Sequence, residues 1–400
     1  MLGDLKYIFD IVKFNERAKA YSETAIVCFP FKTNPNIEIV KALNFLNATG
    51  TLTTFEMDNI IPIQNLVTIH NVHPSRILFS NLSKDPADIY QAIRMGVRHF
   101  TIQDSETFTF IEQTMENISL NKLVKYLVRL NLGNFFHGLG IDFLRFGASL
   151  KIFHSIYNAA RERKKEIGIS FHAPQELESI VGSTHQNNVA TIISTIQQYL
   201  AANNMHIDFL DIGGNTSLEE LNSTEMQTSL RSFKQSQQNC QIIIESGSGI
   251  VQDCFDLESK IKTVNERIAP IGQLDDTGFP ITVIHMAAGI YAGLLDNKLL
   301  GKEYEFLFNP EGEKEPILLE PLGKELKEGY KVVYLCGSSA DIKDTMGYFQ
   351  IPSGVNISPS DTIIIKNTGA YSEALFTRFT GQANPETVLL PNIGRDSLFR

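Results

Sequence analysis

The sequence predicts an α/β protein: a (β/α)8 barrel of the TIM type followed by a mostly antiparallel β domain. The first 250 residues alternate short apolar runs, rich in β-branched residues, with longer segments of helical period. Eight strand candidates fall in that region, and parallel neighbours need a crossover helix between them. Eight is also the number of strands that closes a barrel. An open, doubly wound sheet is the alternative that this pattern allows.

The barrel strands are predicted in short apolar runs, with helices in the intervals. In chain order the strands occupy residues 25–31, 51–54, 77–80, 99–103, 125–131, 169–172, 207–212 and 241–245. Asp85 caps a helix that ends before Gly96, and Asp104 caps the next one. A long amphipathic helix begins at Ser149 and is predicted to end at Gly168. A polar helix rich in Glu and Gln separates the last two strands.

After about residue 255 the pattern changes to closely spaced strand candidates. They occupy residues 281–284, 317–320, 331–335 and 361–366, with Gly and Pro between them. Such spacing is typical of antiparallel sheets. We therefore expect two domains, a barrel over residues 11–255 and a β domain over residues 256–400.

The composition indicates a globular cytoplasmic protein. Hydrophobic residues make up 43% of the 400, and no apolar run is long enough to span a membrane. The four cysteines are scattered without a CxxC pair, as expected of free thiols in a reducing compartment. The N-terminus lacks the basic start of a secretory signal. A net charge of −10 argues against nucleic acid as a partner, and the one basic run, 161–165, contains Glu162.

Polar residues and glycines follow the ends of the predicted strands, where the catalytic groups of a β/α barrel lie. In chain order they are Lys32, Asp104, Arg129, His172, Gly213, Gly214 and Glu245. A lysine, a histidine, an arginine, two acids and a glycine-rich turn are therefore expected to converge on one rim.

Each of these residues, taken alone, also fits an ordinary structural role. A lysine after an apolar strand usually packs its stem and exposes its ammonium group, and a glycine pair fits a simple turn. His70 and His73 have a spacing that can hold a metal on a helix. They lie in a loop-like stretch without a third ligand nearby, so we expect no metal site.

Together, the residues meet the requirements of one cofactor, pyridoxal 5′-phosphate. Lys32 would hold it as a Schiff base, for which it must lose its proton, and burial and nearby positive charge favour the neutral amine. Backbone N–H groups at residues 213–214 and Gly247 suit the phosphate. The carboxylate of Glu245 suits a protonated pyridine nitrogen, and the flat ring of His172 can stack on the cofactor.

The chain resembles a known family in motifs that run in the family's order from Phe29 to Gly381. Residues 29–35 (FPFKTNP) look like the cofactor-lysine motif, usually YAVKAN, of the ornithine and diaminopimelate decarboxylases, which have the fold of alanine racemase. The other matches are 76–84 (RILFSNLSK), 145–147 (RFG), 170–172 (SFH), 211–214 (DIGG), 245–247 (ESG), 337–344 (GSSADIKD), 367–371 (NTGAY) and 379–381 (FTG). The chain is thus similar to the fold-type III decarboxylases that depend on pyridoxal phosphate, as a divergent member.

The resemblance implies a homodimer with active sites at the subunit interface, acting on an amino-acid-type substrate. The implied catalytic residues are Lys32 and His172 of one barrel and Asp341 from the β domain of the other subunit, where it would recognise a distal cationic group. The implied cofactor-binding set is Lys32, Arg129, His172, Gly213, Gly214, Glu245, Gly247, Ser248 and Tyr371. The opening segment, 1–10, would join the β domain.

Three positions depart from the family pattern. The family's loop places a cysteine, thought to return a proton to Cα, just before its acid, and Ala340 stands there in this chain. Ser248 replaces the arginine of the family's EPGR motif, and Ser338 replaces a loop proline. These departures leave stereochemical control, cofactor affinity and substrate identity open.

We expect a carboxy-lyase that acts on an amino acid or an amino-acid-derived conjugate, with tailoring of a siderophore or a microcin-like peptide antibiotic as one setting. Racemisation or epimerisation on the same fold is an alternative, which needs acids on both faces of Cα. A catalytically silent homologue that binds a partner protein is another. Loss of the loop cysteine favours this reading, and retention of Lys32, His172 and Glu245 opposes it.

Overall fold

The computed structural model describes residues 3–118, 124–136, 145–173, 185–214, 216–269, 279–312, 315–381 and 383–390. The chain forms two compact units. One comprises Asn15–Lys32 and Ile39–Gly249, and the other comprises Met1–Phe14, Thr33–Glu38 and Ile250–Arg400. The assignment of cofactor binding to residues 11–255 remains a proposal.

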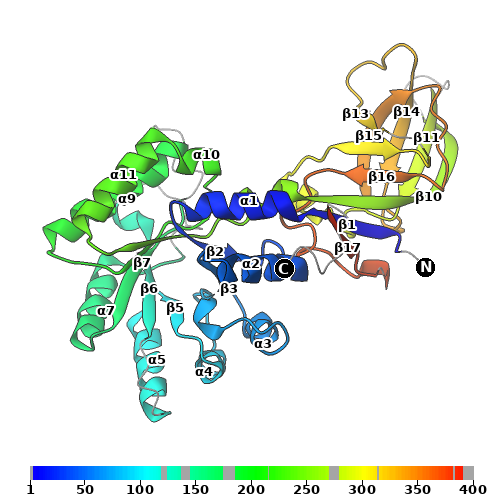
Figure 1. The fold of residues 1–400 in the computed structure, drawn as a ribbon. Coiled ribbons are helices and arrows are strands. Elements are labelled where there is room, and N and C mark those ends of the chain that lie inside the picture. Colours follow the sequence, from blue (N-terminus) through cyan, green and yellow to red (C-terminus); the bar gives the residue numbers. More distant parts are fainter. Residues whose placement is uncertain are drawn as a thin grey trace. The chain divides into compact units, whose positions relative to one another are not determined.

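Eight parallel strands form a closed barrel in sequence order (Figure 1). They are β2 (Ile26–Pro30), β3 (Thr53–Met57), β4 (Ile77–Phe79), β5 (His99–Ile102), β6 (Lys125–Arg129), β7 (Glu166–Ser170), β8 (Phe209–Asp211) and β9 (Gln241–Ile244). The ring closes where β2 pairs with β9, with Ile26 opposite Ile243 and Val27 opposite Ile244. The predicted barrel is confirmed, and the open sheet is excluded.

The helices of this part of the chain follow the capping signals of the sequence. They include α1 (Ile11–Ser22), α2 (Ile37–Ala48), α3 (Ile60–Thr68), α4 (Pro86–Met95), α5 (Ser105–Asn117), α7 (Leu150–Glu162), α9 (His185–Ala202), α10 (Leu218–Leu221), α11 (Thr224–Ser236) and α12 (Ser248–Val251). Asp85 caps α4, and Gly96 ends it in the left-handed conformation. Asp104 caps α5 by accepting a hydrogen bond from Thr107 N (2.7 Å). None of the helices that the structure describes is long and apolar enough to cross a membrane.

The predicted boundary between α7 and β7 is wrong. The helix ends at Glu162, where Lys164 takes the left-handed backbone conformation, and Gly168 lies inside β7. A Cβ at Gly168 would lie 2.3 Å from the carbonyl oxygen of Phe209 on β8. The glycine therefore serves close strand packing and is not a helix stop.

We expect Gly168→Ala to lower the free energy of unfolding by about 1–3 kcal/mol, because its methyl group meets backbone that has no room to move. Gly323→Ala is the matched control: a Cβ there meets nothing within 4 Å, so its effect should stay within about 0.5 kcal/mol. Urea unfolding of both variants measures the difference, and equal midpoints would contradict the packing argument.

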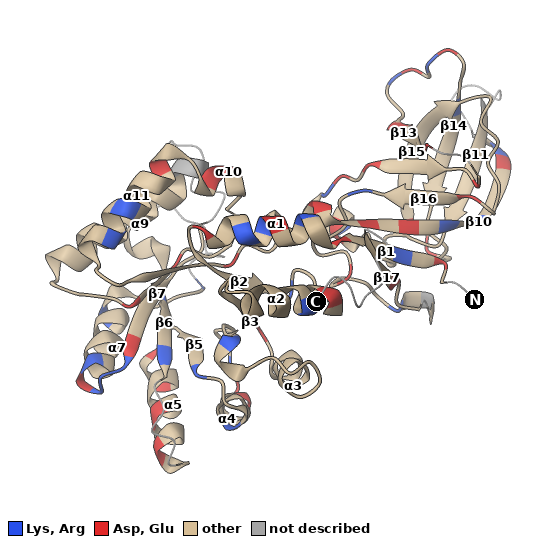
Figure 2. Cartoon of the chain, viewed as in Figure 1, with Lys and Arg blue, Asp and Glu red and all other residues tan. Residues whose placement is uncertain are grey.

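Charged residues of both signs gather at the end of α7 (Figure 2). Arg161 forms an ion pair with Asp208 (2.9 Å), and Lys165 forms one with Glu112 (3.3 Å). The basic run of the sequence is thus balanced by acids on neighbouring elements, and it does not present a continuous cationic surface.

The second unit is built around a nine-stranded sheet in the order β11-β14-β15-β13-β12-β16-β10-β1-β17. Its strands are β1 (Leu5–Asp10), β10 (Phe255–Ala269), β11 (Phe279–Met286), β12 (Phe306–Asn309), β13 (Ile317–Pro321), β14 (Tyr330–Cys336), β15 (Thr345–Pro352), β16 (Thr362–Ile365) and β17 (Glu386–Leu390), and the short helix α13 (Leu295–Leu300) lies between β11 and β12. Among the described strands of this sheet, only β1–β17 and β11–β14 pair in parallel. The predicted mostly antiparallel domain is confirmed, and β1, from the opening segment, pairs with β10 in its sheet.

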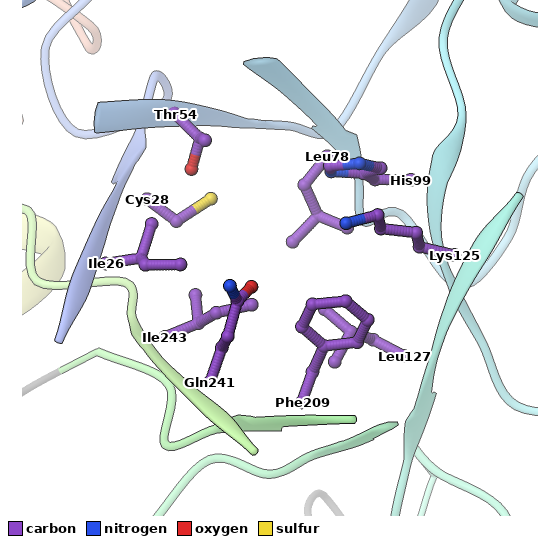
Figure 3. Close-up of a pocket in the computed structure, with 10 residues that line it drawn as sticks. All are labelled: Ile26, Cys28, Thr54, Leu78, His99, Lys125, Leu127, Phe209, Gln241 and Ile243. Atoms are coloured by element: carbon purple, nitrogen blue, oxygen red, sulfur yellow. The ribbon is translucent and has the colours of Figure 1, made fainter. Parts of the chain in front are cut away.

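A cavity of about 60 Å³ lies inside the barrel at the end where the strands begin (Figure 3). Leu78, Leu127 and Phe209 form its apolar wall, and the tips of Lys125 and Gln241 point into it. Because these residues lie in the early positions of their strands, the cavity is at the opposite mouth of the barrel from the predicted catalytic rim.

Candidate active site

The barrel brings most of the predicted site residues to one rim. Glu245 N donates to Gly213 O (2.8 Å), which joins the ends of β8 and β9. Lys32, at the end of β2, and Arg129, at the end of β6, both lie within the electrostatic influence of Glu245. Burial lowers the pKa of Arg129, and the neighbouring Glu245 and Asp211 act against that lowering. The roles assigned to these residues remain proposals.

Lys32 is surrounded by acids. Its Nζ lies 3.3 Å from Glu56 Oε1 and 3.0 Å from Asp58 Oδ2. Burial lowers the pKa of Lys32, but the carboxylates of Glu56, Asp58 and Glu245 outweigh burial and raise it above its ordinary value. The expectation that nearby positive charge favours the neutral amine is therefore wrong, because the charges next to this half-exposed side chain are negative.

Three carboxyl groups lie together beside this lysine. Burial and the nearby Glu245 raise the pKa of Glu56 to about 8. Burial raises the pKa of Asp211 to about 6, and burial together with Asp211 raises the pKa of Glu245 well above its usual range. Asp211 and Glu245 are close enough to share a hydrogen bond, so one of the two holds a proton near neutral pH.

The glycine-rich turn after β8 packs closely against the backbone next to His172. Gly213 has a φ of +72°, and a Cβ there would lie 2.5 Å from Phe171 O and 3.3 Å from His172 Nδ1. A Cβ at Gly214 would lie 2.9 Å from the carbonyl oxygen of Glu245. Gly213 N donates to Asp211 Oδ1 (2.9 Å), so this residue contributes room and a rigid turn and not a free N–H group.

Gly247 and Ser248 follow β9 at the start of the short helix α12. Gly247 is buried and Ser248 is partly exposed. Gly249 is held close to two hydroxyl groups, since a Cβ there would lie 2.3 Å from Tyr21 Oη and 2.5 Å from Ser246 Oγ. Both hydroxyls donate to Thr216 O, at 2.9 Å from Tyr21 Oη and 3.2 Å from Ser246 Oγ. A phosphate would therefore bind through the small residues of this turn and Ser248.

Asp341 and Tyr371 belong to the β-sheet unit, and their roles at the barrel stay predictions. Asp341 Oδ1 accepts a hydrogen bond from Lys343 N (2.7 Å). The buried Asp344 organises the same loop by accepting from Ile290 N (2.7 Å) and Ser339 N (3.1 Å). Tyr371 has a φ of +64°, and its backbone is fixed by a hydrogen bond from its N to Thr33 O (2.8 Å).

The sequence analysis missed Glu56, Asp58 and Lys84 as rim residues. The predicted second strand stopped at residue 54, whereas β3 continues to Met57, so the two acids were not recognised as lying at a strand end. Lys84 donates to Asn81 O and Thr101 O. Burial lowers its pKa to about 7, which nearby acids partly oppose.

These residues fit pyridoxal phosphate. Glu56 Oε2 is buried without a hydrogen-bond partner among the described residues. Asp211 Oδ2 is likewise buried without a hydrogen-bond partner among the described residues, and a protonated pyridine nitrogen would bring a donor and a positive charge to the Asp211–Glu245 pair. At residues 213–214 a Cβ would meet backbone oxygen atoms, so only glycines allow the turn to follow this path along the rim.

Comparison with known proteins decides the family. The family model for the pyridoxal-dependent decarboxylases, pyridoxal-binding domain, matches residues 10–252. The chain belongs to the pyridoxal-dependent decarboxylase family. Its cofactor is pyridoxal 5′-phosphate, and it is an amino-acid decarboxylase, a carboxy-lyase. The resemblance found in the sequence motifs is thereby confirmed.

The relatives of this decarboxylase are distant. It is 21% identical over 286 residues to a diaminopimelate decarboxylase of Helicobacter pylori, covering 66% of this chain and 68% of the relative. The solved structure of the H. pylori diaminopimelate decarboxylase complexed with L-lysine matches with a TM-score of 0.72 at 18% identity, over 97% of this chain and 92% of that one. The arginine decarboxylase of the Paramecium bursaria Chlorella virus matches with a TM-score of 0.70 at 18% identity, over 96% of each chain. The shared fold is thus clear, and the decarboxylase is a divergent member.

The acid cluster makes the cofactor-free decarboxylase lose stability as the pH rises. Glu56 and Asp211 have folded-state pKa values of about 8 and about 6, above the values near 4 expected in the unfolded chain. Folding therefore binds protons, and the stability that these groups contribute is complete below about pH 4 and is lost by about pH 8. We expect a fall of a few kcal/mol over this range, since one pKa unit corresponds to about 1.4 kcal/mol.

Thermal unfolding of cofactor-free protein between pH 5 and pH 8.5 measures this effect. Glu56→Gln should flatten the decline, because it removes a group whose pKa burial raises to about 8. Glu162→Gln, on the exposed end of α7, is the control and should leave the pH profile unchanged. A stability that rises steadily toward pH 8 in the unmodified protein would contradict the pKa directions given above.

Proposed function

We propose that this decarboxylase removes the α-carboxylate of an amino acid or an amino-acid-derived conjugate, with Lys32 as the residue that bonds the cofactor. The supporting observation is that the Asp211–Glu245 pair and Lys32 lie on one rim of one barrel. When bound, pyridoxal phosphate supplies an electron-accepting ring that makes loss of CO2 from Cα possible.

The residues of the chain then have separate tasks. Glu245, next to Asp211, holds a proton at the ring nitrogen. His172, which lies beside the Gly213 turn, would present a flat face to the ring. Lys32 would bond the cofactor through its neutral amine, and Glu56, which lies 3.3 Å from Lys32 Nζ, would take the proton that this amine must lose.

The phosphate and the substrate involve further groups. Residues 213–214, Gly247 and Ser248 would contact the phosphate together with Tyr371. Asp341 of a second subunit would recognise a distal cation on the substrate, which requires a homodimer. With Ala340 in place of the cysteine, Lys32 or a water would return the proton to Cα.

The substrate is proposed from the departures at Ser248, Ser338 and Ala340. They favour a substrate other than that of an ornithine decarboxylase. A conjugate met in siderophore or microcin-like peptide assembly, in the cytoplasm, fits such a divergent site.

The test uses the purified full chain with added pyridoxal phosphate. We expect a yellow protein that loses its colour on borohydride treatment, with the label on the peptide that contains Lys32. Diaminopimelate, lysine, ornithine and arginine are then supplied singly, and CO2 release is measured. Inversion of chirality without CO2 would favour an epimerase, and a colourless protein indifferent to the cofactor would favour a silent homologue.

A further inference from the structure

Asp58 is the second acid beside Lys32. The Lys32–Asp58 contact (3.0 Å) is shorter than the contact with Glu56 (3.3 Å). The Lys32 side chain is 54% exposed and that of Asp58 is 42% exposed. An ion pair this exposed contributes little to folding. Because Asp58 contacts the amine that must bond the cofactor, this ion pair affects the reactivity of Lys32 more than the stability of the fold.

The backbone around Asp58 is fixed, so its carboxylate is held at the rim. Asn81 Nδ2 donates to Asp58 O (2.9 Å), and Ser80 N donates to Met57 O (2.9 Å). The next residue, Asn59, caps α3 by accepting from Ile61 N (3.1 Å). The residue thus lies in a rigid junction between the end of β3 and the start of a helix.

Ser80 joins the two acids that contact Lys32. Its hydroxyl lies 3.2 Å from Asp58 Oδ1 and also contacts Glu56 Oε1. One hydroxyl proton can serve only one of these oxygens at a time. The two carboxylates and the ammonium therefore form a connected group in which each charge depends on the others.

We propose that Asp58 is a positioning residue that holds the Lys32 ammonium at the rim and so controls how fast Lys32 bonds the aldehyde of pyridoxal phosphate. This inference rests on the proposed function. In the reaction, the ammonium first gives one proton to a base, Glu56 or solvent. The neutral amine then attacks the aldehyde carbon, a C=N bond replaces the C=O bond, and the oxygen leaves as one molecule of water. A second carboxylate at 3.0 Å favours the charged form and slows the first step.

Other charged groups near this centre set the background on which Asp58 acts. Among the described residues, those that act on Lys32 or on its acidic neighbours include Glu56, Lys84, Arg129, Asp211 and Glu245, and Asp104 acts on Lys84. Glu56 and Glu245 belong to the proposed cofactor site itself. Asp58 also contacts Lys32, but it has no role in the proposed cofactor site. Its negative charge can therefore be removed without removing a group that the proposed reaction needs.

The experiment mixes cofactor-free full-length protein with pyridoxal phosphate over a pH series and follows the absorbance of the bound cofactor. For Asp58→Asn we expect the pH midpoint of bond formation to fall by about one unit and the rate at pH 7 to rise about tenfold. Asp58→Glu keeps the charge and should behave as the unmodified protein does. Asp88→Asn, an acid on α4, is the control for loss of one negative charge from the barrel.

The outcomes separate this inference from the proposed function. If the unmodified protein forms no borohydride-trapped bond at Lys32, both fail. If it does, and Asp58→Asn has the pH profile of Asp88→Asn, only the role of Asp58 fails. Should Asp58→Asn not fold, Asp58→Ala takes its place: it removes the same carboxylate and should shift the midpoint in the same direction. An unchanged midpoint in that variant would overturn the proposal.

Discussion

Lys32→Ala should abolish covalent cofactor binding and lower kcat/KM by at least about 10³-fold, because no other group replaces an attacking amine at that place. The neighbouring Lys84 is not a substitute, since its Nζ is occupied by the carbonyl oxygens of Asn81 and Thr101. Borohydride treatment followed by mass measurement of the intact chain checks the bond, and CO2 release from the accepted amino acid checks the rate.

Lys151→Ala is the control for this variant. Lys151 lies on the exposed face of α7, so its loss should leave both readouts unchanged. Retention of a borohydride-stable cofactor in Lys32→Ala would show that another lysine holds the cofactor and would overturn the site assignment.

The barrel could be predicted because its signals are local. Each strand is a run of apolar residues, and α4 and α5 are capped by Asp85 and Asp104 where the sequence places caps. The boundary at Gly168 could not be predicted, since its cause is a contact with Phe209, 41 positions away in the numbering of the chain. A glycine at the end of a helical pattern and a glycine packed on a neighbouring strand look alike in sequence.

In the β domain, the long strand β10 escaped prediction although its pattern was present. Phe255, Leu257, Ser259 and Ile261 alternate along it and are all buried at 1% exposure or less. Charged residues lie between them, so the strand contains no continuous apolar run, although every second residue is buried. Its partners β1 and β16 are far away in sequence, and only the fold reveals that they complete one sheet.

In the candidate site, too, some features could be predicted from the sequence and others could not. Lys32, His172, Gly213 and Glu245 could be chosen because each stands at a predicted strand end or in a recognisable motif. The protonation state of Lys32 could not be predicted, because it depends on the acidic side chains at the end of β3 that lie next to the Lys32 amine. A sequence gives the residue types near a strand end but not the sign of the charge that each of them meets.

Glu245→Gln should produce two effects of opposite sign. The decarboxylation rate should fall by about 10²–10³-fold, because an amide cannot hold a proton on the ring nitrogen as a carboxylate does. Cofactor-free protein should become more stable at pH 8, because the substitution removes one of two buried carboxyls that repel each other, leaving Asp211 with a neutral neighbour. CO2 release and thermal unfolding of the same preparation measure the two effects.

A purely structural role for Glu245 would give a different result. Loss of a structural carboxylate lowers stability and activity together. The role proposed for the acid pair instead predicts that activity falls while the stability of the cofactor-free protein rises. Asp211→Asn separates the two members of the pair: it should relieve the same repulsion, yet it also removes the acceptor of the Gly213 N–H group, so its gain in stability should be smaller than that of Glu245→Gln. If Glu245→Gln lowers the melting temperature of the cofactor-free protein at pH 8, the acid pair does not destabilise that form of the protein, and the assignment of the ring nitrogen to the pair fails.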